Sequence, residues 1–178
     1  MKKYFLICAL IILSTFAFGQ SYLGRTLSNT ILKTSSSSNS RVILNVSSGS
    51  QIFIVSLQDF SGYYNVIDIT TNKEGYMPRS KVKIGQQVRQ SEDGIFSSNG
   101  MSSSDAPEVE IYNNTNLTLT LKLNENTYSF LPRVRRTITL PTGNCSYRAS
   151  APGVIPNIGT ETVLGSHSYK WQFYITRR

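Results

Sequence analysis

Residues 62–77 read GYYNVIDITTNKEGYM, and this stretch decides the fold of the first half of the chain. Aromatic and β-branched residues form one run over residues 63–69, and a second, shorter run covers residues 74–77. The polar residues 71–73 lie between the two runs, and residues of this kind are typical of a hairpin tip. The stretch therefore predicts two antiparallel strands joined by a tight turn.

Further short runs of β-branched and aromatic residues flank this hairpin. They lie at residues 30–33, 41–46, 51–57 and 80–84, and Gly, Ser and Asn residues separate them. The run at residues 51–57 is apolar on both faces, which is typical of a central strand. No segment after residue 20 has the i, i+3, i+4, i+7 spacing of an amphipathic helix. We therefore expect an all-β fold.

The same stretches carry a family resemblance. RVILNVSSGSQIFIV at residues 41–55, GYYNV at 62–66 and NKEGYMPRSKV at 72–82 resemble, in their order and spacing, the bacterial SH3-like (SH3b) domain of secreted proteins. The resemblance covers residues 24–84. It implies a small barrel of a kind often attached to cell-wall hydrolases, and it implies cell-wall peptide or glycan as the ligand class. The opening segment ILKTSSS departs from the family, which usually has an NVRxGP type of segment there.

A candidate binding surface follows from the hairpin. Tyr64 and Val66 share one face of the first strand, which we assign to the core, so Tyr63 is expected to point outward. Tyr63 and Tyr76 stand where the family most often carries tryptophan, and exposed tyrosines offer a broad, rigid contact area. An exposed binding surface and ordinary packing both fit these positions. The expected ligand-binding residues are Tyr63, Tyr76, Asn65 and Arg79.

The first 19 residues have the pattern of a secretory signal peptide. Lys2 and Lys3 precede an apolar run of about 15 residues, which is shorter than the roughly 20 residues that cross a bilayer. Small residues precede a cleavage point before Gln20; a retained membrane anchor is the alternative. We expect a periplasmic or secreted protein with no membrane span after cleavage, and a formal net charge that falls from +8 to about +6 with the two lysines.

The second half begins after a change in composition. Residues 85–107 are rich in Ser, Gly, Gln and Asp, and such a segment buries too little apolar surface to offset its chain entropy. We therefore expect a flexible linker there. Residues 108–178 contain about seven short strand-like runs, which predict a small antiparallel β-sandwich. In one of them Cys145, Tyr147 and Ala149 alternate with polar residues and are expected in the core. This half resembles a β-domain of secreted bacterial proteins that has no settled function.

The residue types that carry catalysis are sparse. The chain has one histidine, His167, and cleavage before Gln20 leaves one cysteine, Cys145. A Cys145–His167 nucleophile and base would need the two side chains to be close in space, but the cysteine lies at an expected core position. We find no clustered metal ligands and no phosphate-binding glycine-rich loop. We therefore expect no enzyme, no metal and no cofactor.

These observations predict a non-catalytic binding protein. The expected partner is peptidoglycan or an envelope protein, and export argues against nucleic acid. The leading hypothesis is recognition of cell-wall peptide or glycan by the SH3-like module. One alternative is an envelope structural or adhesion protein that uses both modules for protein contacts. Another is an accessory subunit of a cell-wall hydrolase.

Overall fold

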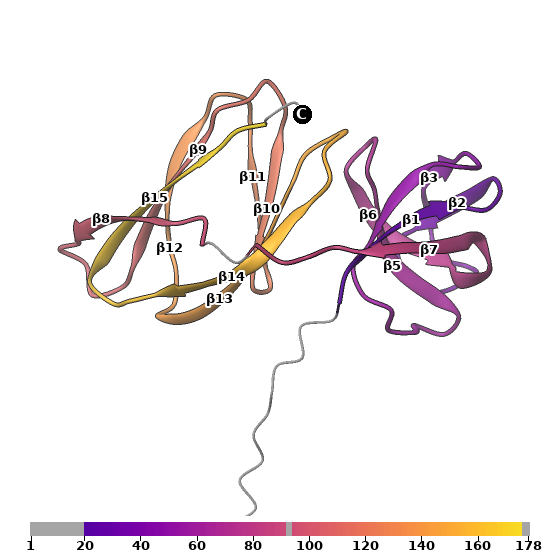
Figure 1. Cartoon of the computed structure of the whole chain (residues 1–178), viewed down its shortest axis with the longest axis horizontal. Coiled ribbons are helices and arrows are strands. Elements are labelled where there is room, and N and C mark those ends of the chain that lie inside the picture. Colours follow the sequence, from indigo (N-terminus) through magenta and orange to yellow (C-terminus); the bar gives the residue numbers. More distant parts are fainter. Residues whose placement is uncertain (1–19, 92–93, 176–178) are drawn as a thin grey trace, which may run out of the picture.

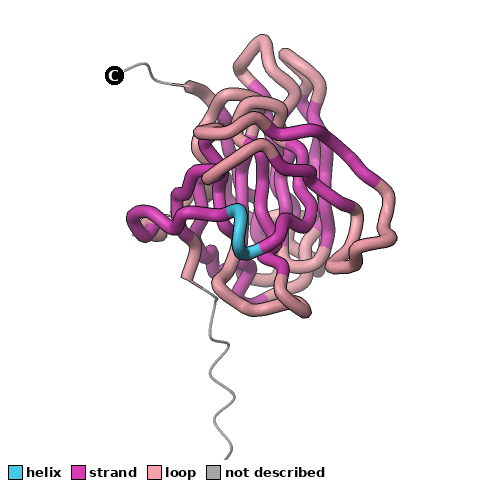
Figure 2. Tube along the Cα trace, turned by 90° about the vertical axis from the view of Figure 1, so that its right-hand side faces the viewer, coloured by secondary structure: helices cyan, strands magenta, loops and turns pink. Residues whose placement is uncertain are grey.

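The computed structural model describes residues 20–91 and 94–175, so the expected signal peptide at residues 1–19 lies outside the described part. Within that part the fold is all-β, as predicted, and its sheets are largely antiparallel. Figure 2 shows that the described residues contain a single short 3-10 turn, η1 (Arg79–Lys81), among strands and loops. Two β modules follow one another along the chain (Figure 1).

The N-terminal module is one seven-stranded sheet with the order β3-β2-β6-β5-β4-β1-β7. The predicted hairpin at residues 62–77 forms β5 and β6, whose register pairs Tyr64 with Met77 and Asp68 with Lys73. The first strand, β1, was not recognised in the sequence. The strands are β1 (Tyr22–Thr26), β2 (Thr30–Lys33), β3 (Val42–Val46), β4 (Gln51–Ile54), β5 (Tyr63–Asp68), β6 (Lys73–Pro78) and β7 (Val82–Gln87).

This sheet curls around its own core. Val46 of β3 and Val82 of β7 come from opposite edges of the sheet, yet both belong to one buried cluster. Tyr64 and Val66 lie in that cluster, as predicted. Gly75 allows the curl, because a Cβ atom there would lie 2.5 Å from the carbonyl oxygen of Lys33 on β2. The Glu-Gly-aromatic step of the sequence is therefore a point of close backbone approach.

The C-terminal module consists of two four-stranded sheets, with the orders β11-β10-β13-β14 and β12-β9-β15-β8. One buried cluster with side chains from both sheets forms its core, which gives a sandwich. Cys145, Tyr147 and Ala149 lie in this core, as predicted. The strands are β8 (Ser97–Met101), β9 (Glu108–Asn113), β10 (Leu119–Leu123), β11 (Asn126–Phe130), β12 (Arg135–Thr139), β13 (Gly143–Ser150), β14 (Asn157–Val163) and β15 (His167–Phe173).

Pairing in the second sheet is not sequential. β15 pairs in parallel with β9, and its other edge pairs antiparallel with β8 from His167 to Lys170. His167, which was expected in a loop, is the first residue of β15.

Parts of two strands lie within residues 85–107, where a flexible linker was expected. β7 extends to Gln87, and β8 occupies residues 97–101. Between them Ile95 and Phe96 pack against the core of the C-terminal module, and the buried carboxylate of Glu161 on β14 accepts hydrogen bonds from both of their backbone N–H groups. The composition of the segment is indeed too polar for a core of its own. Ile95 and Phe96 instead use the core and the acceptor of a neighbouring strand.

The two modules pack against each other along a seam. Phe53, Ile67 and Ile69 are buried on the outer face of the N-terminal sheet, and Ile158 of β14 packs against them. The N–H of Gly153 donates to the carbonyl oxygen of Ile69 at 2.7 Å. This contact explains why the run at residues 51–57 is apolar on both faces, since one face of β4 lines the N-terminal core and the other lines the seam.

Candidate functional site

Tyr63, Asn65 and Tyr76 lie together on the outer face of the β5–β6 hairpin. The register pairs Asn65 directly with Tyr76, and Tyr63 is the next residue of β5 on the same face. All three side chains are half-buried, which places them between the two alternatives of exposed surface and ordinary packing. We call this set, with Phe60, the aromatic face.

Phe60 fixes the orientation of Tyr76. Their rings meet edge to face with centroids 5.6 Å apart, a favoured aromatic geometry. Phe60 also forms an isolated β-bridge with Tyr63, with reciprocal backbone hydrogen bonds of 3.0 and 3.2 Å. Sequence reasoning missed Phe60. The available signal was an aromatic residue within the turn DFSG at residues 59–62, where a large apolar side chain has no local reason to be.

Arg79 lies at the end of the same hairpin but faces other groups. Its guanidinium forms an ion pair with Asp59 and lies 5.3 Å from the ring centroid of Tyr64. The Gly62 N–H and the Arg79 guanidinium hold the pKa of the Asp59 carboxyl below its usual range. The Arg79 backbone lies beside the predicted site, because its N–H donates to the carbonyl oxygen of Gly62, which precedes Tyr63, while its guanidinium interacts with Asp59 and Tyr64.

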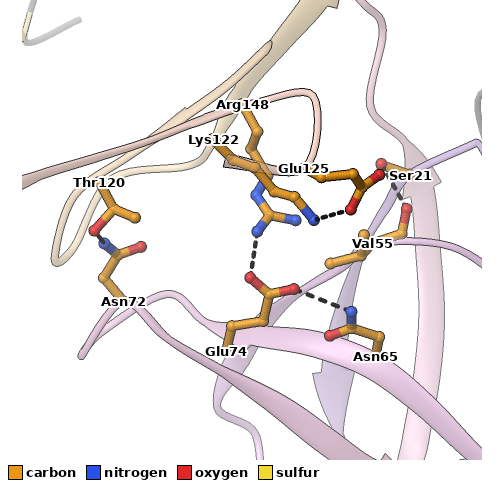
Figure 3. A network of polar contacts seen from close by, with 9 residues as sticks. All are labelled: Ser21, Val55, Asn65, Asn72, Glu74, Thr120, Lys122, Glu125 and Arg148. Atoms are coloured by element: carbon orange, nitrogen blue, oxygen red, sulfur yellow. Dashed lines mark hydrogen bonds and ion pairs between the residues drawn. The ribbon is translucent and has the colours of Figure 1, made fainter. Parts of the chain in front are cut away.

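Asn65 links the aromatic face to the seam. Its Nδ2 donates to Glu74 Oε1 at 3.0 Å, and the other carboxylate oxygen of Glu74 pairs with Arg148 of the C-terminal module. Figure 3 shows this chain of contacts crossing between the modules. Beside it, Asn72 Nδ2 donates to Thr120 Oγ1 at 3.1 Å, which is a second hydrogen bond between the modules. The Oδ1 of Asn65 is buried and has no hydrogen-bond partner among the described residues.

A groove of about 780 Å³ opens between the modules beside this network. One wall is formed by residues 55–58, which follow β4, and the other includes Lys122, Glu125 and Arg148 of the C-terminal module. Val55 joins the groove to the aromatic face, because its N–H donates to the carbonyl oxygen of Asn65 at 3.0 Å. Residues of both modules line the groove, which is why no single sequence motif predicted it.

Cys145 and His167 are not brought together. Cys145 is buried on β13, and burial, with Glu161 nearby, raises the pKa of its thiol. His167 lies on β15 in the other sheet, where its Nδ1 is 2.7 Å from the carbonyl oxygen of Gly165. A search of the described residues finds no group of three or more His, Cys, Asp or Glu side chains that could hold a metal ion. It also finds no helix of the length and hydrophobicity that a membrane crossing requires.

A comparison of the chain with known family models, curated proteins and solved structures gives no match.

Proposed function

We propose that the N-terminal module is an SH3-like binding module that recognises cell-wall peptide or glycan through the aromatic face, without catalysis. The observation that carries the proposal is the arrangement of Tyr63, Asn65 and Tyr76 on one face of β5–β6, with Phe60 fixing Tyr76 edge to face. Fixed tyrosines lose little conformational entropy on binding and provide apolar area with a polar tip.

The polar groups around this face suit a ligand with both apolar and hydrogen-bonding parts. The hydroxyl groups of Tyr63 and Tyr76 can each donate or accept a hydrogen bond with an amide or hydroxyl of the ligand. The groove between the modules continues the surface, which leaves room for a ligand longer than one residue or sugar. Peptidoglycan combines short peptides with glycan, and it is the ligand class that the family resemblance implies.

Sedimentation with purified peptidoglycan tests the proposal. We expect the purified protein to pellet with the wall material, and the double variant Tyr63→Ala, Tyr76→Ala to bind at least tenfold more weakly. The matched control is Leu131→Ala, because Leu131 is a residue of the C-terminal module that is 63% exposed and belongs to neither the aromatic face nor either groove.

Two results would overturn the proposal. In the first, the unmodified protein stays in the supernatant at low salt. In the second, the double variant pellets as well as the unmodified protein while far-UV circular dichroism shows that both are folded.

A further inference from the structure

The second half of β15 has a free edge. β8 pairs with β15 only as far as Lys170, whereas β9 follows the other edge of β15 to its last residue, Phe173. The carbonyl oxygen of Phe173 accepts from Asn114 N–H on the β9 side at 2.9 Å, so the N–H and C=O groups of the preceding residue, Gln172, point to the open edge. An open edge is a template for another strand.

Glu161 keeps this edge open. The chain entering β8 would continue along β15 if it ran straight, but its Ile95 and Phe96 N–H groups turn away to the carboxylate of Glu161 on β14. The side chain of Glu161 thus takes the hydrogen bond from the Ile95 N–H that β15 would otherwise receive. β15 beyond Lys170 consequently has no paired strand on that side within the described residues.

A groove of about 680 Å³, lined by both polar and apolar side chains, runs along the open edge. Trp171 is half-buried in its wall, and exposed apolar side chains gather at its rim: Ile155 is 45% exposed, Tyr174 63% and Ile175 40%. Single exposed apolar residues are ordinary, but several around one groove beside an unpaired strand mark an interaction surface. Lys170 lies at the same rim and forms no ion pair with any described residue.

The existing neighbour of β15 shows which strand fits it. β9 begins EVEIY, and its acids and apolar residues alternate. The register pairs Glu110 with Lys170 on the outer face and Ile111 with Trp171 on the core face. On the other side Ser97 of β8 already lies opposite Lys170, so the free edge begins at Trp171, and a residue opposite Gln172 would lie diagonally next to Lys170 on the outer face. An added strand of the same alternation would place an acid near Lys170 and an apolar side chain in the groove.

We infer that the free edge of β15 binds an extended peptide in which acidic and apolar residues alternate, by strand addition. This site lies in the C-terminal module and is independent of the aromatic face. Its peptide ligand would add backbone hydrogen bonds at Gln172 and bury an apolar side chain between Ile155 and Trp171.

Fluorescence anisotropy with labelled peptides tests this inference. The probe is EVEIYN, the sequence of residues 108–113. The comparison peptides are KVKIYN, which reverses the charge, and EEVIYN, which keeps the composition and destroys the alternation. We expect saturable binding of EVEIYN by the purified protein, at least tenfold tighter than either comparison peptide.

Two variants locate the binding on β15. Ile155→Glu places a carboxylate at the groove rim and is expected to weaken EVEIYN binding at least tenfold, whereas Leu131→Glu, at another residue that is 63% exposed, is expected to leave binding within twofold. Lys170→Glu is expected to reverse the preference between EVEIYN and KVKIYN. The Tyr63→Ala, Tyr76→Ala variant is expected to bind the peptide normally, so failure of this site and failure of the wall-binding proposal are distinguishable.

Three outcomes would overturn the inference. One is equal binding of the three peptides, and another is unchanged binding by a folded Ile155→Glu variant. The third is absence of peptide binding together with a concentration-dependent dimer that Ile155→Glu abolishes, which would show that a second copy of the chain occupies the edge.

Discussion

The two modules expose different parts of their sheets. The N-terminal sheet curls around its own core and has part of its outer face covered by the other module, because Phe53, Ile67 and Ile69 are buried in the seam. The C-terminal sandwich encloses its core between two sheets but leaves half of β15 without a neighbour among the described residues. The two binding proposals therefore differ in kind, since the N-terminal module would bind its ligand on a face and the C-terminal module would bind its ligand at an edge. The seam decides how much of that face remains available.

The largest expected effect comes from emptying the seam with Phe53→Ala. Phe53 is fully buried, so its removal should cost about 4 kcal/mol of unfolding free energy through lost burial and a residual cavity. The single tryptophan, Trp171, reports on the C-terminal module, and circular dichroism reports on both modules. We expect the two urea transitions to coincide in the unmodified protein and to separate in the variant.

Ile54→Ala is the matched control for the seam. Ile54 follows Phe53 on β4 but points into the N-terminal core, so its loss should lower stability while the seam stays intact. If Phe53→Ala lowers stability and the two transitions remain superimposed, the modules are not coupled through this cluster.

A slightly smaller effect is expected from Gly75→Ala, which attacks the curl of the N-terminal sheet. The added Cβ would overlap the Lys33 carbonyl oxygen, and backbone shifts of this kind cost about 3 kcal/mol. Gly49→Ala is the control, because that glycine has φ +78° but no atom within 4 Å of an added Cβ, so only about 1 kcal/mol is expected. Equal losses in thermal unfolding would mean that close approach at Gly75 is unimportant.

The ion pair across the seam should matter less. Glu74→Gln leaves the Arg148 side chain, which is 11% exposed, without its charged partner. We expect the free energy of unfolding to fall by about 2 kcal/mol, which lies between the values for surface and buried ion pairs. A double-mutant cycle with Arg148→Met measures the coupling. Additive losses would show that the pair does not join the modules.

The smallest effect is a pH dependence confined to the N-terminal module. Because folding lowers the pKa of Asp59, its carboxylate stabilises the fold above its ordinary pKa of about 4, and this stabilisation disappears as the pH falls through the lowered value. The melting temperature of Asp59→Asn should therefore fall less between pH 5 and pH 2 than that of the unmodified protein. The difference should be roughly a degree or two, since the pair is exposed. Identical pH profiles would contradict this assignment.

The sequence predicts best where strands pair with their neighbours along the chain. The hairpin at residues 62–77 could be read directly, because its two runs and its turn are contiguous, and alternation then placed Tyr64 and Val66 in the core. Alternation also predicted that Tyr63 points outward, whereas Tyr76 was added to the expected site from the family resemblance. The alternation of residues along a strand does not predict the direction of a long side chain, so the pairing of Arg79 with Asp59 was missed.

Pairing between distant segments was beyond the sequence. In its sheet β15 lies between β8 and β9. β8 and β9 follow each other in the sequence but do not pair, and both pair with β15, which comes much later in the chain. Residues 85–107 are mostly polar, and the backbone N–H groups of Ile95 and Phe96 within them donate to Glu161, more than 60 residues away. The seam was equally hidden, although the double apolar face of β4 was a sign that something covers it.

The buried thiol of Cys145 makes the opening rate of the C-terminal sandwich measurable. Cys145 is 1% exposed, is the only cysteine in the described part of the chain, and has a raised pKa, so a thiol reagent has neither access nor thiolate to react with while the sandwich is closed. When the reagent is in large excess, the labelling rate becomes the rate at which the sandwich opens. The same measurement with seam variants would show how much the contact with the N-terminal module lengthens the lifetime of the closed C-terminal sandwich.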